Sequence, residues 1–470
     1  MCKILDYIRK QGKKVYLISD MYFTGDIIEM ILKSHQITGY DGLYVSCDYL
    51  VGKQEGLFQI VKADLCLDES ARILHIGDNT FADIFAASES GYDTYQIFSP
   101  REMYERSMYS MVIPEPQSIE EELALGKFVS LAYNNPFGKY KENGKLILES
   151  AEQVAELFIA PVIWKYMLFL LQKIFEKQID FVIFPSRDGY LLQKLYDIMK
   201  DTEQKFYPES VYLYTSRRAA LIASAYTEKD INDILSINDT RELKDMIKAR
   251  FGINVEVEWK EDERYTSQNM LEYLLKICRE EREIYKKYIV SSGILEHHLP
   301  GIIDFIAVGT VQSALEKITD KKMQGIYFWK RRSSEERYEK LCVDSLYQPA
   351  GDFDMSANIY RYYYLLENIL SSSEPSFRSL SQEGKPCFYK EEREKKDIEI
   401  LGKIHNSIEN YVRDIGSIMP EADGLTDSIS IYDAILGLLS KEYSEFDEET
   451  IFHMKNVDEF MGRVVTNMNR

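Results

Sequence analysis

The most constraining feature of this chain is a regular alternation of apolar runs and amphipathic stretches between residues 1 and 100. The apolar runs predict strands, at 14–19, 42–46, 72–77 and 94–98. The amphipathic stretches predict helices, at 4–10, 26–34, 55–64 and 81–90. Continuous apolar strands that alternate with helices form a parallel sheet covered on both faces. We therefore expect an α/β domain with a Rossmann-like parallel sheet at residues 1–100.

Three further parts follow. A Pro- and Gly-containing stretch at 101–145 predicts a linker with one short helix. Residues 146–390 predict a second α/β domain with a helical insertion at about 226–290, because strand patterns recur at 179–184, 210–215, 301–306 and 325–330. Residues 391–470 predict an acidic helical tail, with helices at 398–413, 431–443 and 457–465.

Composition narrows the function classes. The chain of 470 residues has a net charge of −20, which argues against a nucleic-acid binder or a binder of anionic membranes, since both need clustered Lys and Arg. Its six cysteines show no CxxC spacing, so we see no zinc signature and no disulfide framework. Without a signal peptide we expect the cytoplasm. The apolar stretch 154–175 contains Glu156, Pro161 and Lys165, which favours a buried core helix over a membrane span.

Polar residues stand at the expected carboxyl ends of strands in the first domain, where parallel sheets bind ligands. Ser19 ends the first apolar run, and Lys53 precedes a helix. Asp78 and Asp83 lie in Gly77-Asp78-Asn79-Thr80-Phe81-Ala82-Asp83. A phosphoryl group that passes between oxygens needs a hydroxyl donor, a cation and carboxylates that hold Mg²⁺. Each residue alone also fits a helix cap or a solvated side chain.

In kind, order and spacing these residues resemble the haloacid dehalogenase superfamily, which is mostly phosphatases. The resemblance implies that Ser19 hydrogen-bonds the transferring phosphoryl group and that Lys53 neutralises its charge. It implies that Asp78 and Asp83 hold Mg²⁺, in a phosphate-ester hydrolase or phosphotransferase. It also implies an Asp-x-Asp motif with the nucleophile on a central strand, between the strands that carry Ser19 and Asp78. Only the helix at 4–10 precedes Ser19's strand, so that motif is absent.

A missing central strand predicts a sheet with a gap and two unpaired edges. Three explanations stay open: a fragment or mis-started gene product, a partner chain that supplies the strand, or a rearranged domain without phosphatase activity. We favour the first. Asp352-Phe353-Asp354 has the letters of the motif, but it follows Pro349-Ala350-Gly351 instead of an apolar strand, so it is a poor substitute.

The predicted strand-to-helix junctions of the second domain also have residue patterns typical of phosphate-binding loops. Backbone amides at a helix start bind anions, and a guanidinium binds phosphate through two hydrogen bonds. The junctions predict a pocket for a phosphorylated sugar or nucleotide, formed by Arg187, Asp188, Gly189, Arg217, Arg218, Asp304, Gly309 and Thr310. The alternative interpretation is a set of helix caps, a tight turn and structural ion pairs.

Residues 302–310 resemble, weakly, the diphosphate-ribose loop of type I phosphoribosyltransferases, with Phe305 in place of a second acid and Val308-Gly309 in place of a Thr-Gly step. The order of motifs from about residue 13 to 380 is similar to that of bacterial predicted hydrolases associated with surface-polysaccharide assembly, which implies a surface-glycan context. A predicted helix near this site carries Tyr362-Tyr363-Tyr364 and Glu367. We interpret these residues first as packing residues and second as residues that stack on a ligand. A transferase acting at the second domain and a non-catalytic scaffold that binds a phosphorylated ligand are the alternatives.

Overall fold

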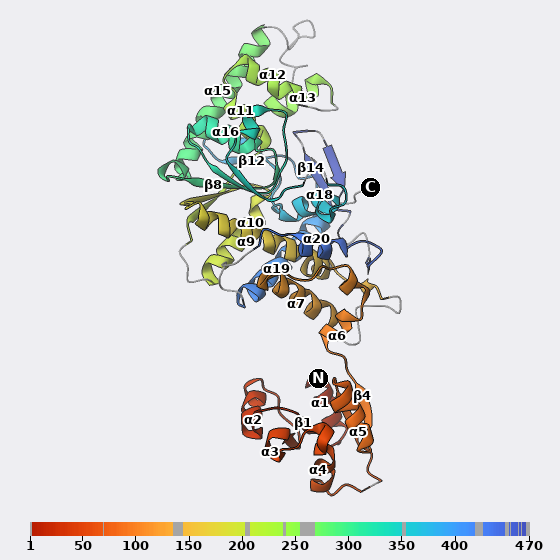
Figure 1. Ribbon diagram of the computed structural model, residues 1–470. Helices are drawn as coiled ribbons and strands as arrows, with labels where there is room; N and C mark the ends of the chain where they lie inside the picture. The colour runs from red at the N-terminus through yellow and green to blue at the C-terminus, as the bar shows by residue number, and fades with distance from the viewer. Residues whose placement is uncertain are drawn as a thin grey trace. The chain divides into compact units, whose positions relative to one another are not determined.

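The protein divides into two compact units, Met1–Arg106 with Tyr133–Phe137, and Ser107–Ala132 with Gly138–Arg470. The computed structural model (Figure 1) describes residues 2–68, 70–134, 144–202, 207–237, 241–253, 268–349, 354–418 and 426–446, and those between 451 and 466 except 452, 459 and 462. Each unit is an α/β structure with parallel strands. The α/β class predicted from the sequence is therefore confirmed.

The first unit contains the alternating strands and helices that its apolar pattern predicts. Its strands are β1 (Tyr16–Ser19), β2 (Gly42–Val45), β3 (Leu74–Gly77) and β4 (Asp93–Gln96). Its helices are α1 (Cys2–Lys10), α2 (Gly25–Ser34), α3 (Ser46–Tyr49), α4 (Leu57–Asp64), α5 (Ala86–Glu89) and α6 (Pro100–Glu105). Two further helical segments, the 3₁₀ turn η1 (Lys53–Glu55) and the π-helix η2 (Thr80–Phe85), contain the predicted site residues Lys53 and Asp83.

The four strands of this unit form two separate two-stranded sheets. β1 pairs with β2 in parallel, with Tyr16 opposite Gly42 and Ser19 opposite Val45. β3 pairs with β4 in parallel, from Leu74 opposite Asp93 onward. Among the described residues, neither β1 nor β3 has a neighbour on its other edge. The gap predicted from the missing strand is therefore present.

The second unit is built on a five-stranded parallel sheet in the order β10-β9-β8-β6-β7. Its strands are β6 (Phe181–Pro185), β7 (Glu209–Leu213), β8 (Pro300–Ala307), β9 (Gln324–Lys330) and β10 (Val343–Tyr347). The chain lays β7 on one side of β6 and then crosses to β8 on the other side. This is the flavodoxin-like strand order, and its reversal point lies between β6 and β8, where such sheets bind ligands.

Helices cover both faces of this sheet. Figure 1 shows α9 (Ala160–Glu176) and α10 (Gly189–Thr202) on one side, and α11 (Arg217–Ser224) and α16 (Thr310–Thr319) on the other. On the α9 face, the Tyr166 ring packs edge-on against Phe305 and Phe328. The helical stretch Ala151–Glu176 is long and apolar enough to cross a membrane, but its apolar window is 94% buried inside the unit, as in the core helix of a globular domain.

The stretch 101–145, predicted to be a linker, mostly joins the second unit. It forms α6, the turn η3 (Met108–Met111) and the long helix α7 (Ile119–Tyr133); residues 135–143 lie outside the described part. Ala124, Phe128 and Ala132 recur every fourth residue and are buried, which gives α7 one apolar face. The buried Glu120 of α7 also pairs with the buried Lys165 of α9.

The segment 391–470 is not a separate tail. Helix α19 (Lys395–Gly416) buries an apolar face that includes Leu401, Ile404 and Ile408, and α20 (Ser430–Gly437) is also buried. The stretch 457–465, predicted to be a helix, instead belongs to the antiparallel strands β14 (Lys455–Asp458) and β15 (Arg463–Thr466). The β-branched residues Val457, Val464 and Val465 favour strands, which the helical periodicity obscured.

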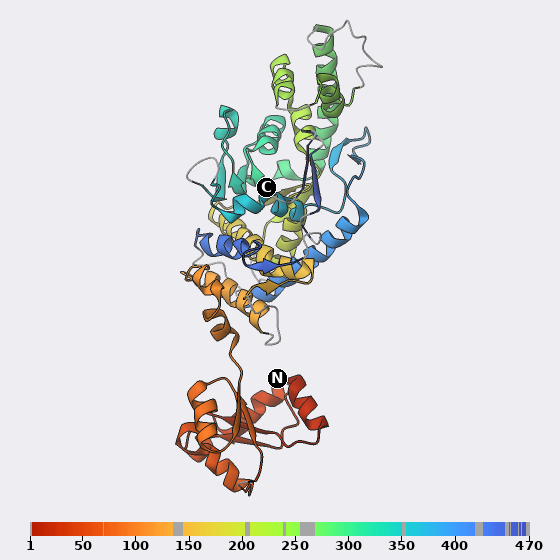
Figure 2. The ribbon, with the colours of Figure 1, turned by 90° about the vertical axis from the view of Figure 1, so that its right-hand side faces the viewer.

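The described residues of the insertion at about 226–290 are mostly helical, as predicted. It contains α12 (Glu228–Ser236), α13 (Leu243–Phe251) and α15 (Gln268–Ser291), drawn in yellow-green to green in Figure 2. These helices share an apolar core that includes Ile234, Phe251 and Leu274. Phe460 and Met461, from the turn between β14 and β15, belong to the same core. Short strands complete the unit, namely β5 (Leu146–Ile147), β11 (Phe377–Leu380), β12 (Pro386–Phe388) and β13 (Ser444–Glu445).

Candidate functional site

A cavity of about 390 Å³ opens at the carboxyl end of the five-stranded sheet, at the reversal point between β6 and β8. Three junctions form its floor, those that follow β6, β7 and β8. Residues from α18 (Asn358–Leu370), from the end of β9 and from the C-terminal segment close its sides. The predicted residues that line it are Arg187, Asp188, Arg217, Arg218, Asp304 and Thr310. The structure therefore brings most of the predicted second-domain site together.

The junction after β6 holds Arg187 in an uncommon backbone conformation. Its φ is +78°, in the left-handed region that residues other than glycine rarely adopt. The Arg187 N–H donates to the Tyr212 hydroxyl at 3.0 Å. The Ser186 hydroxyl donates to the Thr215 carbonyl at 2.5 Å and accepts from the Thr215 N–H at 3.1 Å. Backbone strain of this kind persists where neighbours enforce it, and it is common at functional sites.

Both predicted glycines are required by their surroundings and do not line the cavity. A Cβ at Gly189 would lie 2.8 Å from the Phe184 carbonyl carbon, so glycine lets α10 begin against β6. Gly309 has φ +97°, and its Cβ would lie 2.4 Å from a Leu341 methyl carbon. Gly309 therefore permits the sharp turn that starts α16 at Thr310 beside the cavity.

The two adjacent arginines of α11 have different roles. Arg217 is about half exposed, lines the cavity and pairs with Asp458 at 3.2 Å. Arg218 is buried and gives two 2.6 Å hydrogen bonds to Glu281 of α15. Its Nε also donates to the Arg250 carbonyl. The Arg218 guanidinium thus holds the insertion against α11, and its predicted role in ligand binding stays a prediction.

Four carboxyl groups line the cavity, and three of them, at Asp188, Asp304 and Glu367, have raised pKa values; the fourth is Asp458. Burial, and then repulsion from Asp188, raise the pKa of Asp304 to about 7, although an N–H bond from Phe305 and the charge of Arg217 oppose the shift. Burial also raises the pKa of Asp188 and of Glu367 against the opposing charges of Arg187 and Arg217. Near neutral pH the cavity therefore holds acids that can give or take a proton.

Aromatic side chains of α18 form one wall of the cavity. The rings of Tyr363 and Tyr364 lie 3.9 Å apart, and both side chains line the cavity together with Glu367. Tyr362, from the same predicted cluster, is buried instead. Of the three tyrosines, Tyr362 therefore packs in the interior, whereas Tyr363 and Tyr364 are placed to contact a ligand.

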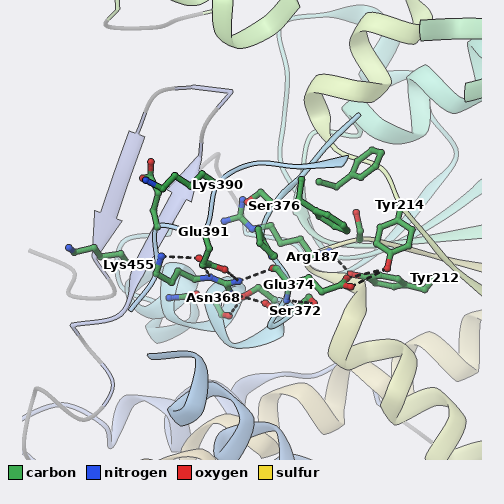
Figure 3. Close-up of a pocket in the computed structure, with 17 residues that line it drawn as sticks. Arg187, Tyr212, Tyr214, Asn368, Ser372, Glu374, Ser376, Lys390, Glu391 and Lys455 are labelled. Carbon is green, nitrogen blue, oxygen red and sulfur yellow. Dashed lines mark hydrogen bonds and ion pairs between the residues drawn. The ribbon is translucent and has the colours of Figure 1, made fainter. Parts of the chain in front are cut away.

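A smaller pocket of about 40 Å³ adjoins this cavity and shares Ser186 and Arg187 with it. Figure 3 shows Tyr212 and Tyr214 at one end of this pocket and Lys455 of β14 at the other. The Tyr214 hydroxyl donates to the Glu374 carboxylate at 3.2 Å. Arg393 donates to the carbonyls of Ser372, Ser373 and Glu374, which fixes the turn after α18.

In the first unit, the structure brings Lys53 and Asp83 together but leaves Asp78 apart. Lys53 Nζ lies 2.5 Å from Asp83 Oδ1, and His75 Nε2 lies 2.9 Å from the same oxygen. Burial alone would raise the pKa of Asp83, but hydrogen bonds from His75 and Lys53 and the Lys53 charge hold it well below its usual range. Ser19 is half-buried at the end of β1, and Asp78 is exposed. Asp20, next to Ser19, accepts from the Lys53 N–H at 3.0 Å.

These residues do not form a ready magnesium site. Asp83 Oδ1 receives Lys53 and His75, and Oδ2 accepts from the Asn79 N–H at 3.0 Å, so both its oxygens are engaged. Within the described part of the chain, no three His, Cys, Asp or Glu side chains are grouped so that they could hold a metal. The expected pair of Asp78 and Asp83 therefore does not fit Mg²⁺ in this arrangement.

Sequence reasoning missed several residues at both sites. Arg331 directly follows β9, so the strand-end rule that found Arg187 could also have found it. His75 precedes its partner Asp83 by eight residues, but nothing in the spacing indicates the contact. Asp458 reaches Arg217 from 241 residues further along the chain and gives no local signal.

A scan against protein-family models finds no family that matches this chain, and a search of the curated proteins finds no match.

Proposed function

We propose that the second unit binds a phosphorylated small molecule, a sugar phosphate or nucleotide, and that it catalyses a transfer reaction of the phosphoribosyl or glycosyl type. The observation that carries the proposal is the cavity at the sheet's reversal point, where Arg187 and Arg217 face Asp188, Asp304 and Glu367. Guanidinium groups bind phosphate through charge-assisted hydrogen bonds. A transfer at a sugar's anomeric carbon needs, in addition, carboxyl groups that stabilise positive charge and exchange protons.

Each group has a role in this scheme. Arg187 and Arg217 hold the phosphate and, in a transfer, the negative charge that develops on a phosphorylated leaving group. Asp304 and Glu367 have raised pKa values, so each is suited to general acid or base work near neutral pH. Tyr363 and Tyr364 offer an aromatic surface for a sugar or a base. If the carboxyl groups serve only in binding, the site belongs to a non-catalytic scaffold.

The test measures the melting temperature of the full chain with phosphoribosyl diphosphate. A ligand at a hundred times its dissociation constant stabilises its protein by about 2.7 kcal/mol, so we expect a rise of several degrees. Asp304→Ala and Arg217→Gln should remove or reduce this rise. Arg101→Gln is the matched control, because Arg101 is an exposed arginine of the first unit, outside the cavity lining. An unchanged melting temperature, or equal shifts in all four proteins, would contradict the proposal.

A second candidate function concerns the first unit. We propose that it derives from a haloacid dehalogenase-like phosphatase, on the basis of Lys53 and Asp83 in contact at the strand ends and of the divided sheet. The described residues offer no aspartate on a strand between β1 and β3, and both oxygens of Asp83 are engaged. The alternative Asp-x-Asp segment at 352–354 has its first two residues outside the described part. The Asp354 carboxylate accepts from the Ser356 N–H and so caps a turn.

For the first unit we therefore expect no turnover of p-nitrophenyl phosphate with Mg²⁺ by this chain. Turnover that requires Mg²⁺ and disappears in Asp78→Ala would contradict this expectation and restore the hydrolase. Under both candidates the biological context that the resemblance implies, surface-polysaccharide metabolism in the cytoplasm, stays a proposal.

A further inference from the structure

The C-terminal hairpin, which we define as β14, β15 and the described residues of the turn between them, forms part of the cavity wall. Asp458, Phe460 and Met461 all line the cavity. The two strands pair only with each other among the described residues, so no larger sheet holds the hairpin in place. Its position therefore depends on the side chains and backbone groups that it sends toward its neighbours.

One set of contacts fixes the turn to the helical insertion. Phe460 and Met461 are buried in the core formed by α12, α13 and α15. The Arg250 guanidinium lies 4.8 Å from the centre of the Phe460 ring, and Arg241 donates to the Phe460 carbonyl at 2.6 Å. The packing of the Phe460 and Met461 side chains is apolar and buried, so an anion in the cavity does not compete for it.

A second contact is ionic and faces the cavity. Asp458 Oδ2 lies 3.2 Å from a terminal nitrogen of Arg217, while Oδ1 accepts from the Met461 N–H at 3.0 Å. The Arg217 side chain is 47% exposed and that of Asp458 is 34% exposed. Ion pairs with this much exposure contribute only about 0–1 kcal/mol. A phosphate group, with more oxygens and more charge, forms stronger hydrogen bonds to the same guanidinium.

From this geometry we propose that Asp458 is a built-in competitor for the phosphate position, and that a phosphorylated ligand displaces it from Arg217 and frees the C-terminal hairpin at that end. The inference rests on the proposed function of the second unit, because the ligand is the anion that Arg217 binds there. It assigns to Asp458 the control of affinity and of access. Phe460 then couples the state of Arg217 to the helical insertion, since the turn remains fixed in the insertion core.

The test is a double-mutant cycle with phosphoribosyl diphosphate and, separately, inorganic phosphate as probes, measured by titration calorimetry on the full chain. Loss of a competing pair worth up to about 1 kcal/mol corresponds to at most about a fivefold change in affinity. We therefore expect Asp458→Asn to bind the anion two- to fivefold more tightly than the wild type. In an Arg217→Gln background, Asp458→Asn should change the affinity little, because the position for which Asp458 competes is gone.

Asp414→Asn is the matched control for net charge. Asp414 is 64% exposed, pairs with Lys127 at 2.8 Å and lies outside the cavity lining. If the wild type binds the anion and Asp458→Asn binds it equally or more weakly, the competitor role is overturned. The proposed function then stays in place. An equal gain in Asp414→Asn would also overturn it, since the effect would then be one of total charge. No binding by either the wild type or Asp458→Asn would refute the proposed function, and the inference with it.

Discussion

The carboxyl group of Asp304 should make the stability of the second unit fall as the pH rises. The substitution Asp304→Asn should remove this dependence. Its pKa is about 7 in the folded protein against 3.8 for an ordinary aspartate, chiefly because of burial. Each pKa unit corresponds to about 1.4 kcal/mol, so the ionised carboxylate costs about 4 kcal/mol in the folded state. The folded pKa is raised, so the penalty is absent well below pH 4, grows as the pH rises and is complete above about pH 8.

Asp304→Asn keeps the oxygen that accepts the Phe305 N–H at 2.9 Å but cannot ionise. At pH 5 about 1.5 kcal/mol of the penalty is already present, because the unfolded chain is ionised there and the folded one is not. We therefore expect the free energy of unfolding of Asp304→Asn, relative to wild type, to be larger at pH 8.5 than at pH 5 by about 2–3 kcal/mol. This gain in stability should accompany a loss of function, as at other strained sites.

The assay is urea unfolding at both pH values, followed by tryptophan fluorescence. All three tryptophans fall in the residue range of the second unit, so the signal reports this unit. Asp414→Asn serves as control, because it removes one exposed carboxylate that lies outside the cavity lining. A difference between Asp304→Asn and wild type that is the same at pH 5 and pH 8.5 would refute the reasoning, and so would a larger destabilisation at pH 8.5.

Three further predictions concern single positions. Arg218→Met should lower the free energy of unfolding of the second unit by about 3–5 kcal/mol, since it leaves Glu281 without its partner. Arg217→Gln should instead leave stability nearly unchanged and weaken phosphate binding about tenfold or more, so equal stability losses in the two variants would contradict these roles. Lys53→Met should destabilise the first unit by about 3 kcal/mol, measured by amide exchange of β3 and η2. Because the pKa of Asp83 is depressed, this stabilisation is present at neutral pH and is lost as the pH falls below about 4. Gly309→Ala should cost at least about 1 kcal/mol, because alanine is strained at φ +97°, and unchanged thermal unfolding would show that the turn relaxes.

The parts of the fold that sequence reasoning predicted are those set by local pattern. The alternation of apolar runs predicts β1 to β4 and their parallel pairing, and the strand-end rule locates Arg187, Asp304 and Thr310 at one cavity. What it could not predict depends on distant contacts. Arg217 and Arg218 are adjacent and chemically identical, and distant partners such as Glu281, 63 residues from Arg218, make one of them structural. The C-terminal hairpin likewise takes its place through Phe460, which packs into helices that come much earlier in the sequence.

The divided sheet of the first unit also bears on how this protein behaves in concentrated solution. β1 and β3 each lack a partner strand on one edge in the described structure, and the same unit exposes most of Tyr22 and Met30 and half of Phe23. Exposed strand edges beside apolar surface are templates for pairing between molecules. Self-association of this chain should therefore increase with concentration and begin at the first unit. A short peptide that pairs with β1 or β3 would act as a solubilising additive, without any effect on the cavity of the second unit.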